Sequence, residues 1–286
     1  MAYFPYSIDR TLRIYTHGLN KKHRRKHLAE ESKNRESRDR ESRNRESTIR
    51  EIDTVDKIIR QRCTSKYLAD EPLNSKLSRA TIEEVIEAAN FGPVHLTASK
   101  VHRSGEDDSI LPWRFYVLQA GDCRSLRDLL ISRGDGSKVP NMLAAASALI
   151  QVTWLPNPLE TNSQIGVDPG VGADTETHIE VDGSSNLQDR LYDATIENME
   201  HIAAASAAVQ NMLLAATVRG IPTYWSSGGA LRKADVFSWL EIPQREMLLG
   251  SVFLFPEDET GARVVPGKLR DKRGGTENWV KWVEFL

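Results

Sequence analysis

Residues 203–220 read AAASAAVQNMLLAATVRG, and this stretch decides the fold because it is apolar on nearly every side. A helix that is apolar all round belongs at the centre of a globular body or at an interface between subunits. We expect the helix to run from about Leu191 to Val218, and Gly220 is the residue type that most often follows a helix C-terminus. The sequence therefore predicts one long central helix around which the other elements pack.

Shorter elements are expected on both sides of this helix. Thr81 and Glu84 resemble a capping box at the start of a helix that should stop at Gly92-Pro93. Strands are predicted at Phe115–Gln119, Ala148–Trp154, Thr223–Trp225 and Leu249–Phe255, with a further helix around Arg232–Leu240. The strands are short and do not alternate regularly with helices, which favours an α+β fold over a doubly wound sheet. The absence of a GxGxxG motif argues against a Rossmann domain.

The overall composition indicates a globular protein. The chain has 286 residues, of which 40% are hydrophobic and 27% are charged. No run approaches the roughly 18 consecutive apolar residues that cross a bilayer, so no membrane span is expected. Cys63 and Cys123 are too few for a disulfide framework and lack the spacing of a metal site. We therefore expect a cytoplasmic protein that binds no metal.

The charge is divided unevenly along the chain. Residues 1–50 hold 14 Lys and Arg against 7 Asp and Glu, whereas the other 236 residues hold 24 against 33. A basic cluster at residues 21–27 precedes a five-residue repeat over residues 34–47 that has no apolar face. We predict a disordered basic arm over residues 1–51 and a globular domain over residues 52–286. A solvated tail is the favoured interpretation of the arm, with nuclear localisation, organellar targeting and RNA contact as alternatives, and the body is not expected to bind nucleic acid.

Four short motifs contain the residues suited to binding or chemistry. They are Gln61-Arg62-Cys63-Thr64-Ser65-Lys66, Gly92-Pro93-Val94-His95, Pro112-Trp113-Arg114-Phe115 and Trp225-Ser226-Ser227-Gly228. Arginine close to hydroxyl and thiol groups suits a phosphate, and aromatic residues beside glycines let the backbone approach a flat ring. Taken singly, each motif fits an ordinary structural role such as a solvated helix end, a hydrogen-bonding histidine, a core-edge tryptophan or a turn.

In this order the motifs resemble those of the nitroreductase family, in particular short bacterial NAD(P)H nitroreductases with the motifs R-R-S-x-S-R, A-P-x-H, P-W-x-F and W-R-S-G. The resemblance covers residues 52–286. It implies an α+β sandwich with a central, mostly antiparallel sheet flanked by helices, and a homodimer with FMN at two interface sites. It also implies that NADH or NADPH passes a hydride to flavin N5, which reduces nitroaromatics, quinones or enones.

The resemblance also assigns candidate site residues. The flavin-binding set comprises Gln61, Arg62, Cys63, Ser65, His95, Trp225, Ser226, Ser227, Lys268 and Arg270. The stretch associated with the nicotinamide nucleotide comprises Ala215, Ala216, Thr217, Val218, Arg219 and Gly220. No catalytic acid or base is assigned, because the cofactor carries the chemistry and the proton can come from water or the flavin.

The chain departs from the family pattern at three motif positions. Gln61 stands in place of an arginine, Cys63 in place of a serine, and Ser226 in place of the arginine of W-R-S-G. The first change removes one positive charge from the expected phosphate site, and Arg60 or Lys66 is placed to compensate. The change at Ser226 is expected to affect recognition of the substrate or the nucleotide.

Two insertions are expected near the mouth of the site, at Leu96–Leu111 and at residues 156–188. Together with the motif changes they leave an alternative function open. In that alternative the chain is an interaction module of the same fold, with or without flavin, that works through its basic arm.

Overall fold

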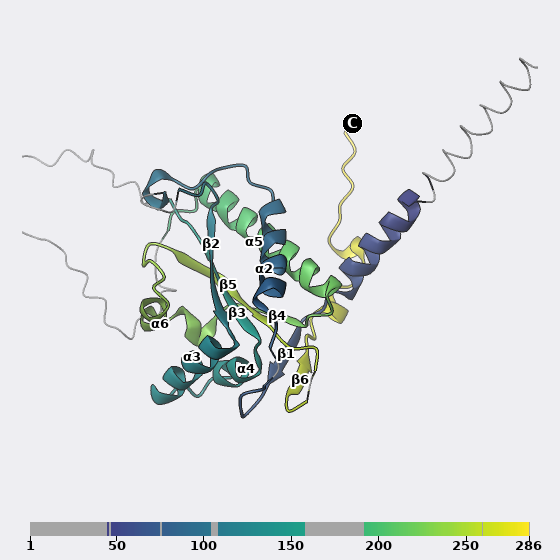
Figure 1. Ribbon diagram of the computed structural model, residues 1–286. Coiled ribbons are helices and arrows are strands. Elements are labelled where there is room, and N and C mark those ends of the chain that lie inside the picture. The colour runs from purple at the N-terminus through teal and green to yellow at the C-terminus, as the bar shows by residue number, and fades with distance from the viewer. Residues whose placement is uncertain are drawn as a thin grey trace, which may run out of the picture. The chain divides into compact units, whose positions relative to one another are not determined.

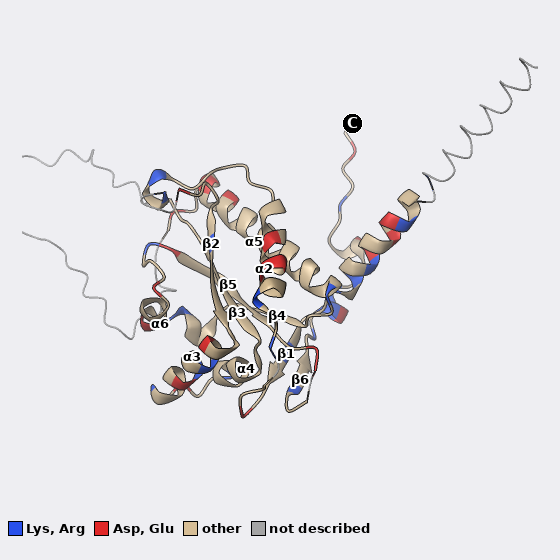
Figure 2. Cartoon of the chain, in the orientation of Figure 1, with Lys and Arg blue, Asp and Glu red and all other residues tan. Residues whose placement is uncertain are grey.

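The computed structural model describes residues 45, 47–74, 76–103, 108–157, 192–258 and 260–285. The chain forms two units, Met1–Ile59 and Arg60–Leu286. Residues 47–61 are helical, with Lys, Arg, Asp and Glu mixed along the helix (Figure 2). This exposed helix includes residues 47–51 at the end of the expected arm, for which a solvent-exposed helix was the alternative to disorder. Contacts one turn apart stabilise this helix, such as the hydrogen bond of 3.1 Å from Ser47 Oγ to Glu51 Oε1. The rest of the expected arm, Arg45 excepted, lies outside the described residues.

The second unit is built on a four-stranded antiparallel sheet with the strand order β2-β3-β5-β4 (Figure 1). Its strands are β2 (Trp113–Gln119), β3 (Ala148–Trp154), β4 (Thr223–Ser226) and β5 (Met247–Leu254). The register pairs β2 with β3 along their whole lengths, and an irregularity between Val152 and Thr153 shifts the pairing of β3 with β5. The expected α+β fold with a mostly antiparallel sheet is confirmed.

One face of this sheet is covered by α5 (Ile196–Val218), α2 (Arg79–Glu87) and the 3-10 helix η1 (Ala88–Phe91) (Figure 1). Alternate residues of a strand point to the same face, so the even-numbered residues 148–154 of β3 pack against this layer. By length and composition α5 is apolar enough to cross a bilayer. Its buried side chains belong to the core beneath the sheet, as expected for the central helix of a globular domain.

Two helix starts differ from the sequence prediction because other residues cap them. The Thr81 backbone N–H donates to Ser78 Oγ at 3.0 Å, so Ser78 caps α2 and the capping box expected at Thr81 is wrong by three residues. The Asn198 backbone N–H donates to Thr195 Oγ1 at 3.2 Å, so Thr195 caps α5. The helix therefore begins at Ile196 rather than near residue 191. The predicted stop at Gly92 is confirmed, because Gly92 follows η1.

The opposite face of the sheet is covered by a second helical layer. It consists of α3 (Ala120–Ser132), α4 (Val139–Ala145), the 3-10 helix η4 (Gly229–Arg232) and α6 (Ala234–Trp239). The core on this side contains Leu118, Leu149 and Phe253, which are matched across three neighbouring strands. The sequence did not predict α3 or α4. The helix expected around Arg232–Leu240 is split into η4 and α6.

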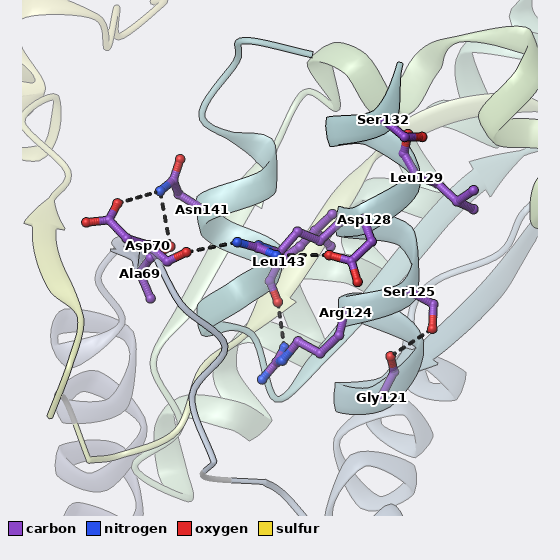
Figure 3. Close-up of polar contacts among 11 residues, drawn as sticks. Ala69, Asp70, Gly121, Arg124, Ser125, Asp128, Leu129, Ser132, Asn141 and Leu143 are labelled. Carbon is purple, nitrogen blue, oxygen red and sulfur yellow. Dashed lines mark hydrogen bonds and ion pairs between the residues drawn. The ribbon is translucent and has the colours of Figure 1, made fainter. Parts of the chain in front are cut away.

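Polar side chains of α3 and α4 fasten the segment that follows the first strand (Figure 3). Arg124 Nη1 donates to the Leu143 carbonyl oxygen at 2.5 Å, and its Nη2 donates to the Leu73 carbonyl oxygen at 3.0 Å. Asn141 Nδ2 donates to the Ala69 carbonyl oxygen at 3.1 Å. These bonds satisfy backbone carbonyls that no strand partner reaches, and they fix the path of residues 69–73.

A second, two-stranded sheet pairs β1 (Ser65–Leu68) with β6 (Arg263–Pro266) in antiparallel orientation. A parallel bridge between Thr64 and Thr223 connects the start of β1 to the start of β4. Three short 3-10 helices complete the described chain, η2 (Lys100–His102), η5 (Arg270–Lys272) and η6 (Thr276–Asn278). The β1 and β6 pairing brings the first motif beside the C-terminal basic residues.

Candidate functional site

The first motif and the C-terminal basic segment meet because of the β1 and β6 register. Ser65 is paired with Pro266, and the Gly267 backbone N–H donates to the Thr64 carbonyl oxygen at 2.8 Å. A Cβ atom at Gly267 would lie 3.1 Å from Thr64 Cβ, so the two segments of backbone approach closely at this point. The residues after β6, including Lys268, therefore continue alongside the first motif. Lys268 itself is exposed.

Arg270 fastens this meeting point. Its Nη1 donates to the carbonyl oxygen of Arg62 at 2.9 Å, and its Nη2 donates to the carbonyl oxygen of Arg60. The planar guanidinium group suits two neighbouring acceptors, because its N–H groups are fixed in a fork. Arg270 thus joins the backbone of residues 60–62 to the segment that follows β6.

Three guanidinium groups gather around the first motif. Burial lowers the pKa of Arg62, Arg270 and then Arg273 lower it further, and Cys63 acts in the opposite direction. All three arginines carry a positive charge at neutral pH. Among the described residues, no carboxylate forms an ion pair with any of them. Like charges held together without a counter-charge favour an anionic ligand such as a phosphate.

A cavity of about 320 Å³ lies beside the first motif. A larger cavity, of about 520 Å³, lies between β2, α3 and α6. The smaller cavity brings together residues from both predicted sets. Its lining includes Gln61, Cys63, Ser65, Tyr67, Thr217, Gly220, Ile221, Pro222 and Thr223. The alternation of β1 accounts for residues 63, 65 and 67 sharing one side. The larger cavity, between β2, α3 and α6, contains none of the predicted site residues, so the smaller one is the better candidate.

The other residues of the predicted nucleotide stretch have different surroundings. Ala216 is completely buried in the core and presents no side-chain surface to a ligand. Arg219 Nε lies 3.1 Å from Glu84 Oε2, and its Nη1 donates to the Ala215 carbonyl oxygen at 3.0 Å. Val218 is exposed. Of this stretch, therefore, Thr217 and Gly220 are the residues that line the small cavity.

The fourth motif lies on β4, directly connected to the first motif by the bridge between Thr64 and Thr223. The Trp225 ring packs over Gly250, where a Cβ atom would collide with Trp225 Nε1 and would lie 2.6 Å from the Ser226 carbonyl oxygen. Ser226 is buried, and its Oγ accepts a hydrogen bond of 3.2 Å from the Gly228 backbone N–H. Ser227 is exposed, whereas Trp225 is about one-third exposed.

Lys66 has a partner other than the expected phosphate site. Its Nζ lies 4.6 Å from the centre of the Tyr224 ring, a cation–π arrangement. Arg273 is an additional cation next to Arg62 that was not among the predicted site residues. The available signal was the basic pattern of residues 268–273, in which Lys272 and Arg273 follow the two assigned residues.

The second and third motifs are not brought to this location. His95 is exposed, and among the described residues no hydrogen bond or ion pair joins it to the first motif. The chain that follows η1 lies at the end of α2 remote from β1 (Figure 1). Trp113 is buried in the core, and Arg114 Nη1 donates to the Leu111 carbonyl oxygen at 2.8 Å. The third motif therefore has a structural role in this chain.

Comparisons with known proteins agree with this architecture. The model of the nitroreductase family matches residues 59–254. The chain is similar to a nitroreductase-like family protein from Bacillus cereus, with 16% identity and a TM-score of 0.50, over 80% of this chain and 95% of that one. It is also similar to a putative nitroreductase in complex with FMN from Desulfovibrio desulfuricans, with 18% identity and a TM-score of 0.45, over 80% and 96% of the two chains. No curated protein matches the chain.

The match to the family model covers more than half of the chain, and the first of these structures has the same fold. The expected resemblance is therefore confirmed, and the chain belongs to the nitroreductase family.

Proposed function

We propose that this protein is an FMN-dependent oxidoreductase that takes a hydride from NADH or NADPH and reduces small electrophilic acceptors such as nitroaromatics, quinones or enones. The observation that carries the proposal is the group of Arg62, Arg270 and Arg273, held together without an ion-paired carboxylate among the described residues. Its position beside the first motif of a nitroreductase-family chain suits the phosphate of FMN.

The residues present fit such a cofactor. Arg62 would hold the phosphate, while Gln61, Cys63 and Ser65 provide polar groups along the adjoining cavity. Because Gly250 has no side chain, the Trp225 ring packs directly against the backbone of the sheet. The edge of this ring therefore has a defined position next to the cavity side of β4. When bound, FMN supplies the hydride acceptor and donor chemistry at N5. The protein's part is to bind, to orient the reactants and to exclude water.

We also propose that the working form is a homodimer. Along the helix of the first unit, Ile49, Ile52, Val55 and Ile59 recur every three or four residues, and each is more than half exposed. In the second unit, Trp282 and Phe285 near the C-terminus are almost fully exposed. Large apolar side chains in groups of this kind favour burial against a partner chain. A second copy would also allow His95 of one chain to complete the site of the other.

The visible absorbance spectrum of freshly purified protein tests the function. We expect a flavin spectrum that bleaches when NADPH or NADH is added without oxygen. Absence of flavin, even after incubation with FMN, would overturn the proposal and favour the interaction-module alternative. Light scattering on dilution tests the assembly, for which we expect the mass of a dimer. A stable and active monomer would contradict the proposed dimer.

A further inference from the structure

Two buried histidines hold the point where the chain leaves the central sheet after β3. His201, on α5, places Nδ1 2.8 Å from the Leu155 carbonyl oxygen. His102, on η2, places Nε2 2.7 Å from the Pro156 carbonyl oxygen. Carbonyl oxygens only accept hydrogen bonds, so both of these ring nitrogens carry the hydrogen and donate it. His201 is 1% exposed and His102 is 4% exposed. The two rings therefore bind the carbonyl oxygens of consecutive residues from buried positions.

The same junction holds the described residues of the Leu96–Leu111 insertion, 96–103 and 108–111, against the sheet. Arg114 is the only charged residue in the four strands of the central sheet, all of which are described (Figure 2). Its Nη2 donates to the His102 carbonyl oxygen at 3.2 Å, and its Nη1 donates to the Leu111 carbonyl oxygen at 2.8 Å. Arg114 thus ties both sides of the insertion to β2, while the His102 ring ties it to the end of β3.

The chain that enters α5 is fastened at this junction as well. The Asn157 backbone N–H donates to Asn198 Oδ1 at 2.8 Å, and Asn198 Nδ2 donates to the Asp193 carbonyl oxygen at 2.8 Å. The Trp154 and Tyr192 rings meet edge to face with their centres 5.0 Å apart. Residues 154–157 and 192–198 therefore contact each other. The His201 ring connects α5 to the same residues, and the His102 ring connects the described part of the insertion to them.

The second nitrogen of each imidazole is buried and has no hydrogen-bond partner among the described residues. In the neutral ring this nitrogen is an acceptor without a hydrogen. Protonation of His102 would place a charged N–H where no described acceptor receives it, and such a group is costly to bury. The junction contains three further buried polar atoms without a partner in the described chain, namely Ser99 Oγ, Arg103 Nε and Asn157 Oδ1.

Groups on three neighbouring segments oppose the protonation of His102, namely Arg114 on β2, His201 on α5 and Arg245 before β5. Burial lowers the pKa of His102 most, the hydrogen bond to Pro156 partly offsets this, and Arg245, Arg114 and His201 lower it further. Glu246 is the carboxylate close to both arginines. Its Oε2 accepts a hydrogen bond of 2.5 Å from Thr153 Oγ1, and burial raises the pKa of Glu246.

We propose that His102 and His201 form a clasp, which holds residues 97–103 and α5 to the end of β3 at neutral pH and opens when His102 takes up a proton. In the open state His102 reaches water and binds a proton with the ordinary histidine pKa of about 6.5. In the closed state the pKa of His102 is lower. As the pH falls between these two values, the equilibrium constant for opening rises about tenfold per pH unit, and outside this interval it stays constant.

Hydrogen exchange on the full chain, from about pH 5 to about pH 7.5, tests the clasp in the range where histidine titrates. After correction for the intrinsic pH dependence of exchange, peptides covering residues 97–103 and 153–157 should lose protection as the pH falls. In His102→Gln the amide nitrogen replaces Nε2 as donor without titrating, so protection should no longer decrease as the pH falls. The matched variant His201→Asn keeps a donor near the Nδ1 position and should retain the pH dependence.

Equal pH dependence in His102→Gln and the wild type, or constant protection in the wild type, would overturn the clasp. The imidazole proton signals of the wild type give a second measurement if the variant does not fold. We expect the His102 signal to titrate below about pH 6.5, and a midpoint at or above this value would contradict the proposal. Flavin content is measured separately. A negative result for the clasp would therefore not contradict the proposed function, and an absence of flavin would not contradict the clasp.

Discussion

Arg270 and Arg62 are separated by 208 positions, yet Arg270 Nη1 donates a hydrogen bond of 2.9 Å to the Arg62 carbonyl oxygen. The second Nη of Arg270 donates to the Arg60 carbonyl oxygen, so both ends of the guanidinium fork hold the backbone at the start of the first motif. Arg270 is therefore better suited to position Arg62 than to serve as a free phosphate ligand. Arg62 and Arg273 remain as the cations available to an anion.

Replacing Arg62 with alanine is expected to weaken FMN binding. A hydrogen bond to a charged group contributes about 1.5–3 kcal/mol, so the dissociation constant should rise about ten- to a hundredfold. Titration of the apoprotein with FMN, followed by flavin fluorescence, measures this constant. Arg79→Ala is a matched control, because it removes the same charge from an exposed residue that pairs with Glu83. Unchanged FMN affinity in Arg62→Ala would remove Arg62 from the site.

Replacing Arg270 with lysine separates positioning from charge. Lysine keeps the positive charge but lacks the planar fork that reaches two carbonyl oxygens at once. If Arg270 positions Arg62, the lysine variant should lose FMN affinity nearly as much as Arg270→Ala. The corresponding change Arg273→Lys should retain most of the affinity, because Arg273 contributes mainly charge. Wild-type affinity in Arg270→Lys would show that its charge alone matters.

The long helix and the central strands follow from local patterns in the sequence. The continuous apolar run predicts α5, and the strand expected at Ala148–Trp154 is found with the same limits, because its residues are buried on both faces of the sheet. Helix α3 was not predicted because its apolar residues are interspersed with Gly121, Asp122 and two arginines, so its periodic signal is weak.

The site depends on contacts that no local pattern contains. Pairing of β1 with β6 joins segments about 200 positions apart, and without that register neither Arg273 nor the role of Arg270 is visible. The insertions were expected near the mouth of the site, but the described part of the first one is fastened through His102 to the end of β3. Residues 158–188 of the second insertion lie outside the described residues.

Replacing Gly250 with alanine is expected to destabilise the fold and displace Trp225. The added Cβ would collide with the Trp225 ring and approach the Ser226 backbone carbonyl, which cannot move without disturbing β4. Overpacking of this kind costs about 1–3 kcal/mol, which urea denaturation measures. Gly121→Ala in α3 is the control, because no heavy atom lies within 4 Å of the new Cβ and alanine favours a helix. Equal stability of the two variants would show that β4 accommodates the Cβ.

Replacing Glu246 with glutamine is expected to stabilise the protein in a pH-dependent manner. Burial raises the pKa of Glu246, and the hydrogen bonds from Thr153 and Tyr116 and the charges of Arg114 and Arg245 offset this only partly. The folded state therefore holds the proton more tightly than the unfolded state, whose carboxyl pKa is about 4.3. As the pH rises from that value through the folded pKa, the wild type loses stability, and above the folded pKa the loss is constant.

Glutamine keeps a neutral oxygen that can accept the Thr153 hydrogen bond and never ionises. The difference in unfolding free energy between Glu246→Gln and the wild type should therefore grow across this pH interval and then level off, as urea denaturation at several pH values can measure. Glu87→Gln, at an exposed position, should show no such growth. A difference that shrinks with rising pH would mean that Arg114 and Arg245 outweigh burial, and that Glu246 is held as a buried carboxylate.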